Sequence, residues 1–162
     1  MSSITLTGAL SDRDSWTAED CSLAAALDVL GRRATLLLLR EAFYGAHRFD
    51  EFVRHAGFTE ALTAERLRGL VDEGVLERRP YQEPGQRSRD EYHLTDKGRD
   101  LLPVIVALMR WGDTWARPDG GPVAFTHTTC GAPIDVHVRC AEGHAVSIED
   151  IDADLRHSAA SR

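Results

Sequence analysis

The sequence predicts an α+β fold that is mainly α-helical, and three observations lead to this expectation. Four segments between residues 21 and 73 have the composition or the i, i+3, i+4 apolar spacing that is typical of helices. Residues 75–94 then hold two short β-like runs, separated by a loop rich in Pro, Gly and Arg. A long apolar helix is expected next, over about residues 95–116, and a second β-like stretch follows it.

Length and composition suit one ordinary globular domain. The 162 residues are 43% hydrophobic and 28% charged. Cys21, Cys130 and Cys140 are too few and too scattered for a secreted disulfide framework. The N-terminus lacks a basic start and a cleavage site, and no apolar run approaches the roughly 20 residues of a membrane span. We therefore expect a cytoplasmic protein with no membrane partner.

Acidic charge is concentrated at the two ends of the chain, and the formal net charge is −7. Residues 1–30 carry one basic and five acidic groups, and residues 100–162 carry five and nine. The middle, residues 31–99, carries 13 basic and 12 acidic groups. Binding to nucleic acid requires a basic face rather than a basic protein, so this balance weakens the expected field without excluding DNA.

The first two predicted helices differ in character. Residues 21–30 are strongly helix-forming, and Gly31 is a suitable residue to end that helix. Residues 34–43 are apolar on almost every side, as expected of a central helix, and Gly45 ends it.

Two further helices are joined by a glycine turn. Asp50 is a good N-cap for a short helix that Gly57 closes, and Thr59 is expected to cap the next one. Such a pair fits a helix-turn-helix, whose second helix (about 59–73) enters the major groove, although a generic helical pair is the alternative. The inward stripe predicted for the second helix consists of Thr63, Leu67, Leu70 and Gly74.

The segment after this pair predicts a wing. Residues 75–79 are expected to form a strand, residues 81–90 a basic loop, and residues 91–94 a returning strand. These parts in this order make a winged helix-turn-helix, with the wing at about residues 80–91. Arg87 and Arg89 at the hairpin tip can lie along phosphates, although an ordinary solvated turn is the alternative.

The long helix that follows carries more apolar surface than its own core requires. Thr95 is its expected N-cap, and Pro103 should kink or delay its first turn. Apolar residues recur on it at steps of four and three, as in a coiled-coil seam. We therefore expect a dimerisation helix, with a helix that only covers its own core as the alternative. The predicted interface residues are Leu101, Ile105, Leu108, Met109, Trp111 and Trp115.

The chain is expected to divide into a flexible N-terminal arm (1–20), the winged domain (21–117) and a small β-rich extension (118–162). Residues 123–127 and 134–138 are β-like and predict a small β-hairpin appendage, and Ser147 with Asp150 begins a short acidic helix.

Two thiols and two imidazoles in this extension have a spacing that can bind zinc. They are His127, Cys130, Cys140 and His144. Tetrahedral zinc suits this ligand set and would stabilise an appendage too small for its own core. A metal-free hairpin and a Cys130–Cys140 disulfide are the alternatives, and no other cofactor is expected.

Several segments together resemble the HxlR family of winged-helix regulators. They are Cys21 with residues 27–31, the run 35–41, the Arg-Phe-Asp-Glu-Phe motif at 48–52, Arg66-Leu67 with Leu70 and Gly74, the run 77–79, and the run 91–95 with Gly98. The matches are collinear over about residues 21–116. Ser22 stands where relatives usually have Pro, and Glu60 opens the recognition helix where a basic or neutral residue is common.

The resemblance implies a homodimer in which each subunit presents a recognition helix and a wing to half of an inverted-repeat operator in double-stranded DNA. Members repress or activate genes, and we expect a repressor that responds to a thiol-reactive species or a small-molecule effector. Some members react through a cysteine at the position of Cys21; from the residues alone, a buried structural cysteine is the alternative.

The outward face of the recognition helix and the wing supply the expected DNA contacts. Arg68 and the wing arginines are candidates for phosphate contacts, and the small or acidic helix residues are candidates for base contacts. The complete predicted set is Thr59, Ala61, Ala64, Glu65, Arg68, Arg78, Arg87 and Arg89. Glu60 and Glu65 would repel phosphate, so a protein-interaction module without strong DNA binding is the alternative function. No catalytic motif stands out, and we do not expect an enzyme.

Overall fold

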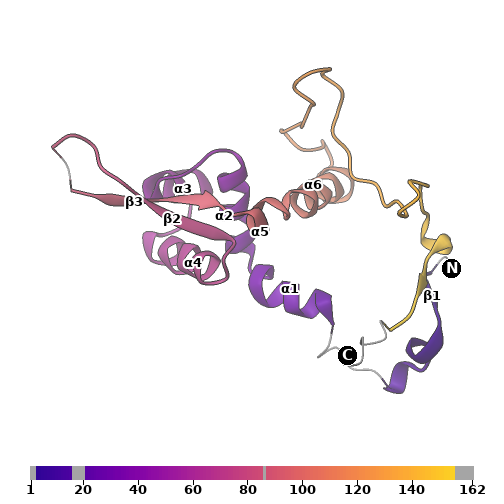
Figure 1. Ribbon diagram of the computed structural model, residues 1–162. Coiled ribbons are helices and arrows are strands. Elements are labelled where there is room, and N and C mark those ends of the chain that lie inside the picture. Colours follow the sequence, from indigo (N-terminus) through magenta and orange to yellow (C-terminus); the bar gives the residue numbers. More distant parts are fainter. Residues whose placement is uncertain (1–2, 16–20, 86, 156–162) are drawn as a thin grey trace. The chain divides into compact units, whose positions relative to one another are not determined.

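The computed structural model describes residues 3–15, 21–85 and 87–155 (Figure 1). The chain forms two compact units, a larger one spanning Ala25–Asp135 and a smaller one made of Met1–Ala24 and Val136–Arg162. The predicted divisions after residues 20 and 117 do not coincide with these boundaries, and the three-part division stays a prediction.

Four α-helices precede the hairpin, as the composition and apolar spacing predicted. The Gly57 backbone has φ +70° and ends the third of them, and the Thr59 hydroxyl accepts a 3.3 Å hydrogen bond from the Leu62 amide at the start of the fourth. The helices are α1 (Ser22–Leu30), α2 (Arg33–Phe43), α3 (Phe49–Ala56) and α4 (Glu60–Asp72).

The predicted N-cap of α3 was wrong. The helix begins at Phe49, so Asp50 lies inside the first turn and Arg48 is in the N-cap position. The carboxylate of Glu51 folds back and accepts 2.9 Å hydrogen bonds from the backbone amides of His47 and Arg48. A carboxylate three residues into a helix can satisfy the free amides in this way without a capping side chain at position 50.

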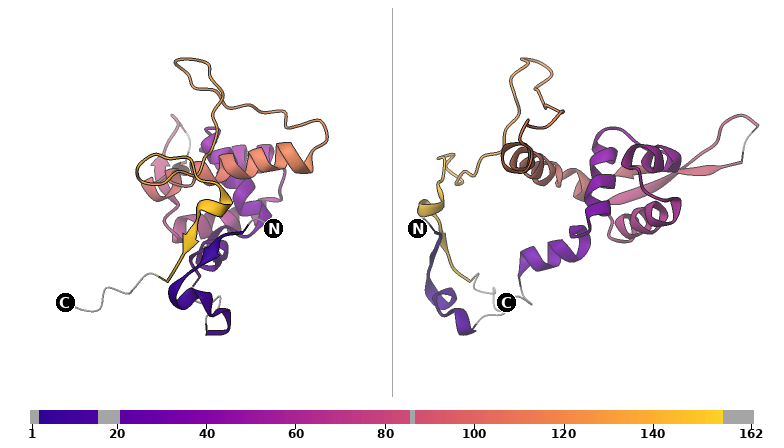
Figure 2. Two further views of the ribbon diagram at one scale, coloured as in Figure 1. Left: turned by 90° about the vertical axis from the view of Figure 1, so that its right-hand side faces the viewer. Right: turned by 180° about the vertical axis from the view of Figure 1, so that it is seen from behind.

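The predicted hairpin is present. Strands β2 (Leu76–Tyr81) and β3 (Arg89–Leu94) pair antiparallel, in a register that runs from Leu76 opposite Leu94 to Tyr81 opposite Arg89. Arg48 forms an additional antiparallel bridge to Glu91. Helices α3 and α4 lie on either side of the hairpin base (Figures 1 and 2).

The core of the larger unit lies between α2, α3, α4 and this hairpin. Phe52 of α3 is fully buried, and its ring meets that of Tyr92 edge to face, with centroids 6.0 Å apart. The inward stripe of α4 is as predicted for Thr63, Leu67 and Leu70, all of which are buried, whereas the fourth predicted member, Gly74, is exposed in the turn after the helix ends. The other large side chains with almost no exposure are Leu38, Leu39, Val75 and Leu76.

After the hairpin the chain forms two helices rather than one continuous helix. Thr95 caps α5 (Asp96–Arg99) by accepting a 3.1 Å hydrogen bond from the Gly98 amide. Helix α6 (Leu102–Trp111) then begins with Pro103 in its first turn and continues into a π-helical turn, Gly112–Ala116. The interruption near Pro103 matches the predicted delay, because proline is tolerated only at the start of a helix.

The two β-like runs of the extension do not form the predicted hairpin strands. Between residues 123 and 145 the described chain shows only single bridges, Thr126 to Pro133 and Arg139 to Ala145. Pro133 has no amide hydrogen to extend a ladder. The amides of Ile134 and His127 donate to the carbonyls of Phe125 (2.9 Å) and Ala132 (2.8 Å) beside the first bridge. The Phe125 ring lies beside that of Tyr44, with centroids 6.2 Å apart.

The smaller unit joins the two ends of the chain. Strand β1 (Thr5–Leu6) pairs in parallel with β4 (Asp152–Ala153). Ser147 and Asp150 form the expected capping box, but it encloses a 3-10 turn, Ile148–Asp150, rather than a helix.

Residues 1–2 and 16–20 of the predicted arm lie outside the described residues. Across the described ranges, no helix is long and apolar enough to cross a membrane.

Candidate nucleic-acid interface

Helix α4 separates a buried face from an exposed one. Thr59, Ala61, Glu65 and Arg68 are exposed and Ala64 is half-buried, whereas the stripe described above faces the core. The 3.6-residue repeat produces this division, because residues three and four apart share a face. Ala61, Ala64, Glu65 and Arg68 therefore lie on one side of α4, and Thr59 is exposed at its N-cap.

The wing presents arginines from both strands. Arg78, Arg87 and Arg89 are all exposed, and the Arg78 guanidinium lies 5.8 Å from the centre of the Tyr92 ring. Arg79 is held by Glu77 through hydrogen bonds of 2.6 and 2.9 Å. The predicted wing contacts are thus exposed side chains on a paired hairpin next to α4.

Arg48 connects α3 to the wing, and the sequence did not single it out for this role. Its guanidinium lies 2.8 Å from the Glu83 carboxylate, 3.6 Å from that of Glu91, and 4.7 Å from the centre of the Tyr81 ring. Its backbone also pairs with β3. The Arg-Phe-Asp-Glu-Phe motif marked the position, but its partners lie more than 30 residues further along the chain.

The start of α3 is polar and strongly hydrogen-bonded. Hydrogen bonds from the Arg48 and His47 backbone amides hold the pKa of Glu51 below its ordinary value. The His47 ring stacks on that of His93, with centroids 4.5 Å apart, and the Tyr92 amide donates a 2.8 Å hydrogen bond to the His47 carbonyl. These contacts attach the hairpin to the helix-turn-helix through backbone and side chains together.

The predicted dimer residues fall into two groups. Ile105 is buried in the core, and Leu101 and Met109 pack against it. Leu108, Trp111 and Trp115 are 50%, 62% and 75% exposed. The second group is available to a partner. On α1, the Leu23 and Leu27 side chains are also exposed.

An apolar cavity of about 690 Å³ lies between α2 and α6. Arg33 and Arg40 contribute its charged groups. The guanidinium of Arg40 is hydrogen-bonded to the buried carboxylate of Glu41, which leaves Arg33 as the more available cation. The apolar side chains that line the cavity are Leu36, Leu37, Ile105, Leu108, Met109 and Trp111.

The cysteine and metal predictions stay predictions. Cys21 is half-buried and immediately precedes α1. The His127 Nδ1 atom lies 3.2 Å from the Cys130 Sγ atom in the larger unit, and the Cys140 amide donates to the His144 carbonyl in the smaller unit. Within the residues that the structure describes, no three His, Cys, Asp or Glu side chains gather as metal ligands.

Comparisons with known proteins agree with this geometry. Residues 29–120 match the model of the HxlR-like helix-turn-helix family. An uncharacterised HTH-type transcriptional regulator of Mycobacterium tuberculosis is 44% identical over 120 residues, which are 74% of this chain and 75% of that protein.

Two solved structures extend the likeness to the fold. PA1607, assigned as a transcription factor, is 36% identical with a TM-score of 0.73, and the match covers 87% of this chain and 96% of that one. The redox regulator HypR in its reduced form is 30% identical with a TM-score of 0.51, over 57% of this chain and 90% of that one.

Proposed function

The chain belongs to the HxlR-like helix-turn-helix family of transcriptional regulators, and from this premise we propose that it is a homodimeric repressor that binds an inverted-repeat operator in double-stranded DNA. One observation carries the proposal: the exposed face of α4 and the exposed arginines of the wing belong to one unit, in which β2 packs against α4 and Arg48 joins the wing to α3. A helix in the major groove with a hairpin beside it needs both elements held together.

The proposal assigns a role to each exposed residue. Arg68, Arg78, Arg87 and Arg89 contact phosphates, which position the protein without reading sequence. Ala61 and Ala64 contact base edges, for example thymine methyl groups, and Glu65 accepts from a cytosine amino group. Thr59 contributes its cap and an exposed side chain at the start of the helix.

Two subunits are required because one helix and one wing read only half of a site. Leu108, Trp111 and Trp115 on α6 and Leu27 on α1 are the apolar side chains proposed to meet those of a second copy. An effector then acts on this dimer, and Cys21 is the proposed thiol for an electrophile or oxidant; HypR, whose fold is similar, is a redox regulator.

The zinc site is proposed separately. His127 with Cys130, and Cys140 with His144, would supply two imidazoles and two thiolates. Elemental analysis of the purified protein tests it: one zinc per chain that is lost in a His144→Ala variant supports the site, and a metal content near zero contradicts it.

The central experiment is fluorescence-anisotropy binding to DNA from upstream of the protein's own gene, measured as salt increases. Selective binding that weakens steeply with salt is expected, because each phosphate contact releases counterions. Equal binding to random DNA of the same length, at low salt, contradicts the regulator proposal. That result favours the second candidate, a protein-interaction module, for which the carboxylates of Glu60 and Glu65 on the exposed face of α4 are the supporting observation.

A further inference from the structure

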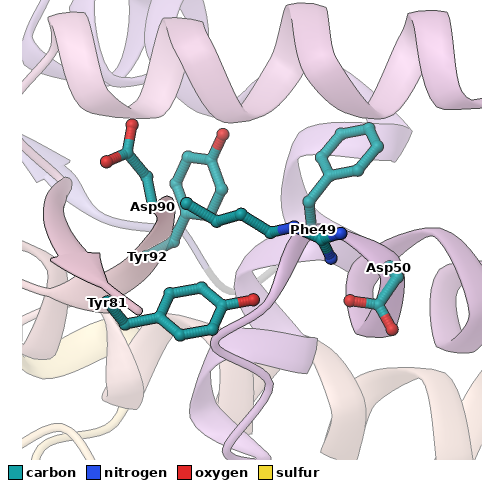
Figure 3. A pocket seen from close by; sticks show the side chains of 6 residues that line it. Phe49, Asp50, Tyr81, Asp90 and Tyr92 are labelled. Atoms are coloured by element: carbon teal, nitrogen blue, oxygen red, sulfur yellow. The ribbon is translucent and has the colours of Figure 1, made fainter. Parts of the chain in front are cut away.

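A cavity of about 360 Å³ lies between the first turn of α3 and the wing. Figure 3 shows Tyr81, Asp90 and Tyr92 of the hairpin on one side and Phe49 and Asp50 of α3 on the other. We call it the wing cavity, and its lining residues are Phe49, Asp50, Tyr81, Arg89, Asp90 and Tyr92.

The lining combines aromatic rings with carboxylates, which is the chemistry that recognises organic cations. Aromatic faces attract cations through the ring quadrupole, and carboxylates add a direct charge. The same tyrosines already make such contacts within the chain: Arg48 lies over Tyr81 and Arg78 over Tyr92. These contacts show that both rings can take part in cation–π interactions, and that Arg48 and Arg78 already use one surface of each ring.

The lining of the wing cavity has one more carboxylate than cations, because Asp50 and Asp90 accompany a single arginine, Arg89. Asp50 is also paired with Arg54 of α3 at 3.6 Å, so among the described residues the lining carboxylate without such a pair is that of Asp90. The neighbouring Arg48 is matched by two carboxylates, Glu83 and Glu91. The positive end of α3 does not reverse this balance, because the Glu51 carboxylate already accepts hydrogen bonds from two amides there.

A carboxylate in the wing weakens the attraction between the wing and DNA phosphates. Asp90 follows Arg89 directly in β3, so its carboxylate opposes the attraction of that arginine for DNA. A cation held in the wing cavity would neutralise Asp50 and Asp90 and would repel the Arg89 guanidinium toward solvent. Both effects favour a phosphate contact by Arg89.

We propose that the wing cavity binds a small organic cation with a flat apolar body, such as an amidinium or a protonated heteroaromatic amine, and that its occupancy raises the affinity for operator DNA. The effect on DNA affinity rests on the proposed function, whereas the binding of the cation does not. Coupling between two ligands is reciprocal, so DNA raises the affinity for the cation by the same factor.

The first test uses the full chain without DNA and a matched pair of probes. Benzamidinium is a flat cation at neutral pH, and benzamide is its neutral counterpart of almost the same shape. Isothermal titration calorimetry is expected to show one benzamidinium per subunit, bound about tenfold more tightly than benzamide. Equal affinity for the two probes contradicts the cation site.

Variants locate the site. Asp50→Asn combined with Asp90→Asn is expected to remove the preference for benzamidinium, whereas Asp119→Asn, at an exposed position outside the lining, keeps it. A preference that survives in the double variant overturns the assignment to the wing cavity. NMR of the unmodified protein gives an independent reading: benzamidinium must shift the ring protons of Phe49 and Tyr81, and unshifted rings contradict the site even where the double variant is unstable.

The second test adds operator DNA. Anisotropy titrations with saturating benzamidinium are expected to show tighter DNA binding than titrations with benzamide. Unchanged DNA affinity with the probe bound overturns the effector role. Absence of selective DNA binding under both conditions contradicts the proposed function and the effector role, while the calorimetric result for the cation site stands on its own.

Discussion

Two exposed surfaces of the larger unit differ in the chemistry of their side chains and in how these side chains are attached to the core. The polar surface is the outward face of α4 with the wing: Thr59, Ala61, Ala64, Glu65, Arg68, Arg78, Arg87 and Arg89. The apolar surface carries Leu27 of α1 and Leu108, Trp111 and Trp115 of α6 and the turn after it. Arg48, Glu51 and His47 attach the polar surface to the core by hydrogen bonds and ion pairs. On the apolar surface Trp111 and Trp115 extend into solvent.

The difference indicates two kinds of partner. Arginines and short polar groups suit a ligand that brings its own charge and water, such as a DNA backbone. Large apolar side chains that are at least half exposed suit a partner that removes them from water.

The largest expected effect comes from the apolar surface. Replacing Trp111 and Leu108 by Ser removes apolar area from the proposed dimer contact, so sedimentation should show a monomer. DNA affinity should fall at least about 100-fold, because the two half-sites are no longer bound together. The control is Val138→Ser, which removes an exposed apolar side chain of the smaller unit. A double variant that remains dimeric would show that these residues are not the interface.

A smaller effect is expected when the support of the polar surface is removed. Arg48→Ala deletes the ion pairs to Glu83 and Glu91 and the contact with Tyr81, so the wing loses its side-chain attachment to the start of α3. Operator affinity should fall about tenfold, or about 1.4 kcal/mol, without dissociation of the dimer.

The control for Arg48 comes from the same helix. Arg54 is exposed and makes one ion pair, to Asp50 at 3.6 Å, so Arg54→Ala should have a much smaller effect. Arg48→Lys keeps the charge but not the planar group and should lie between the two. Equal losses for Arg48→Ala and Arg54→Ala would mean that only the loss of one positive charge matters.

The next smaller effect on DNA affinity is expected when one proposed phosphate contact is removed. Arg68→Ala should weaken binding to operator and random DNA alike and reduce the slope of log K against log salt by about 0.9. The matched change is Arg117→Ala, which removes one exposed positive charge beyond α6. The same reduction of slope in both variants would indicate a general field rather than a contact by α4.

How much of this could be predicted from the sequence depends on the range of the interactions. The buried stripe of α4 and the hairpin follow from local periodicity and element order, and both were confirmed. The role of Arg48 depends on Tyr81, Glu83 and Glu91, which folding brings near and no local pattern contains. The prediction of hairpin strands at 123–127 and 134–138 was wrong because a local pattern does not show how far two runs pair. Alternation predicts a strand only where pairing continues along the run, and these two runs are joined by a single bridge at Pro133, which has no amide hydrogen.

The smallest expected effect is a pH dependence confined to the support of the polar surface. Glu51 has a lowered pKa because the amides of Arg48 and His47 donate to its carboxylate. A lowered pKa in the folded state means that this stabilisation is present above the unfolded value of about 4.3 and is lost as pH falls through the folded value. Glu51→Gln should therefore lower the free energy of unfolding by about 1 kcal/mol at neutral pH, and the difference from the unmodified chain should shrink below pH of about 4.

Urea denaturation across this pH range measures the difference, with Glu60→Gln as the control, because Glu60 opens α4 as an exposed first-turn residue. Glu60→Gln should not reproduce the loss of stability that Glu51→Gln causes at neutral pH. Dimerisation, measured over the same range, should not follow the Glu51 titration, since the carboxylate belongs to the start of α3 and not to α6. A dimer that dissociates in parallel with the loss of the Glu51 hydrogen bonds would show that the two surfaces are coupled through the core, contrary to the separation argued from their contacts.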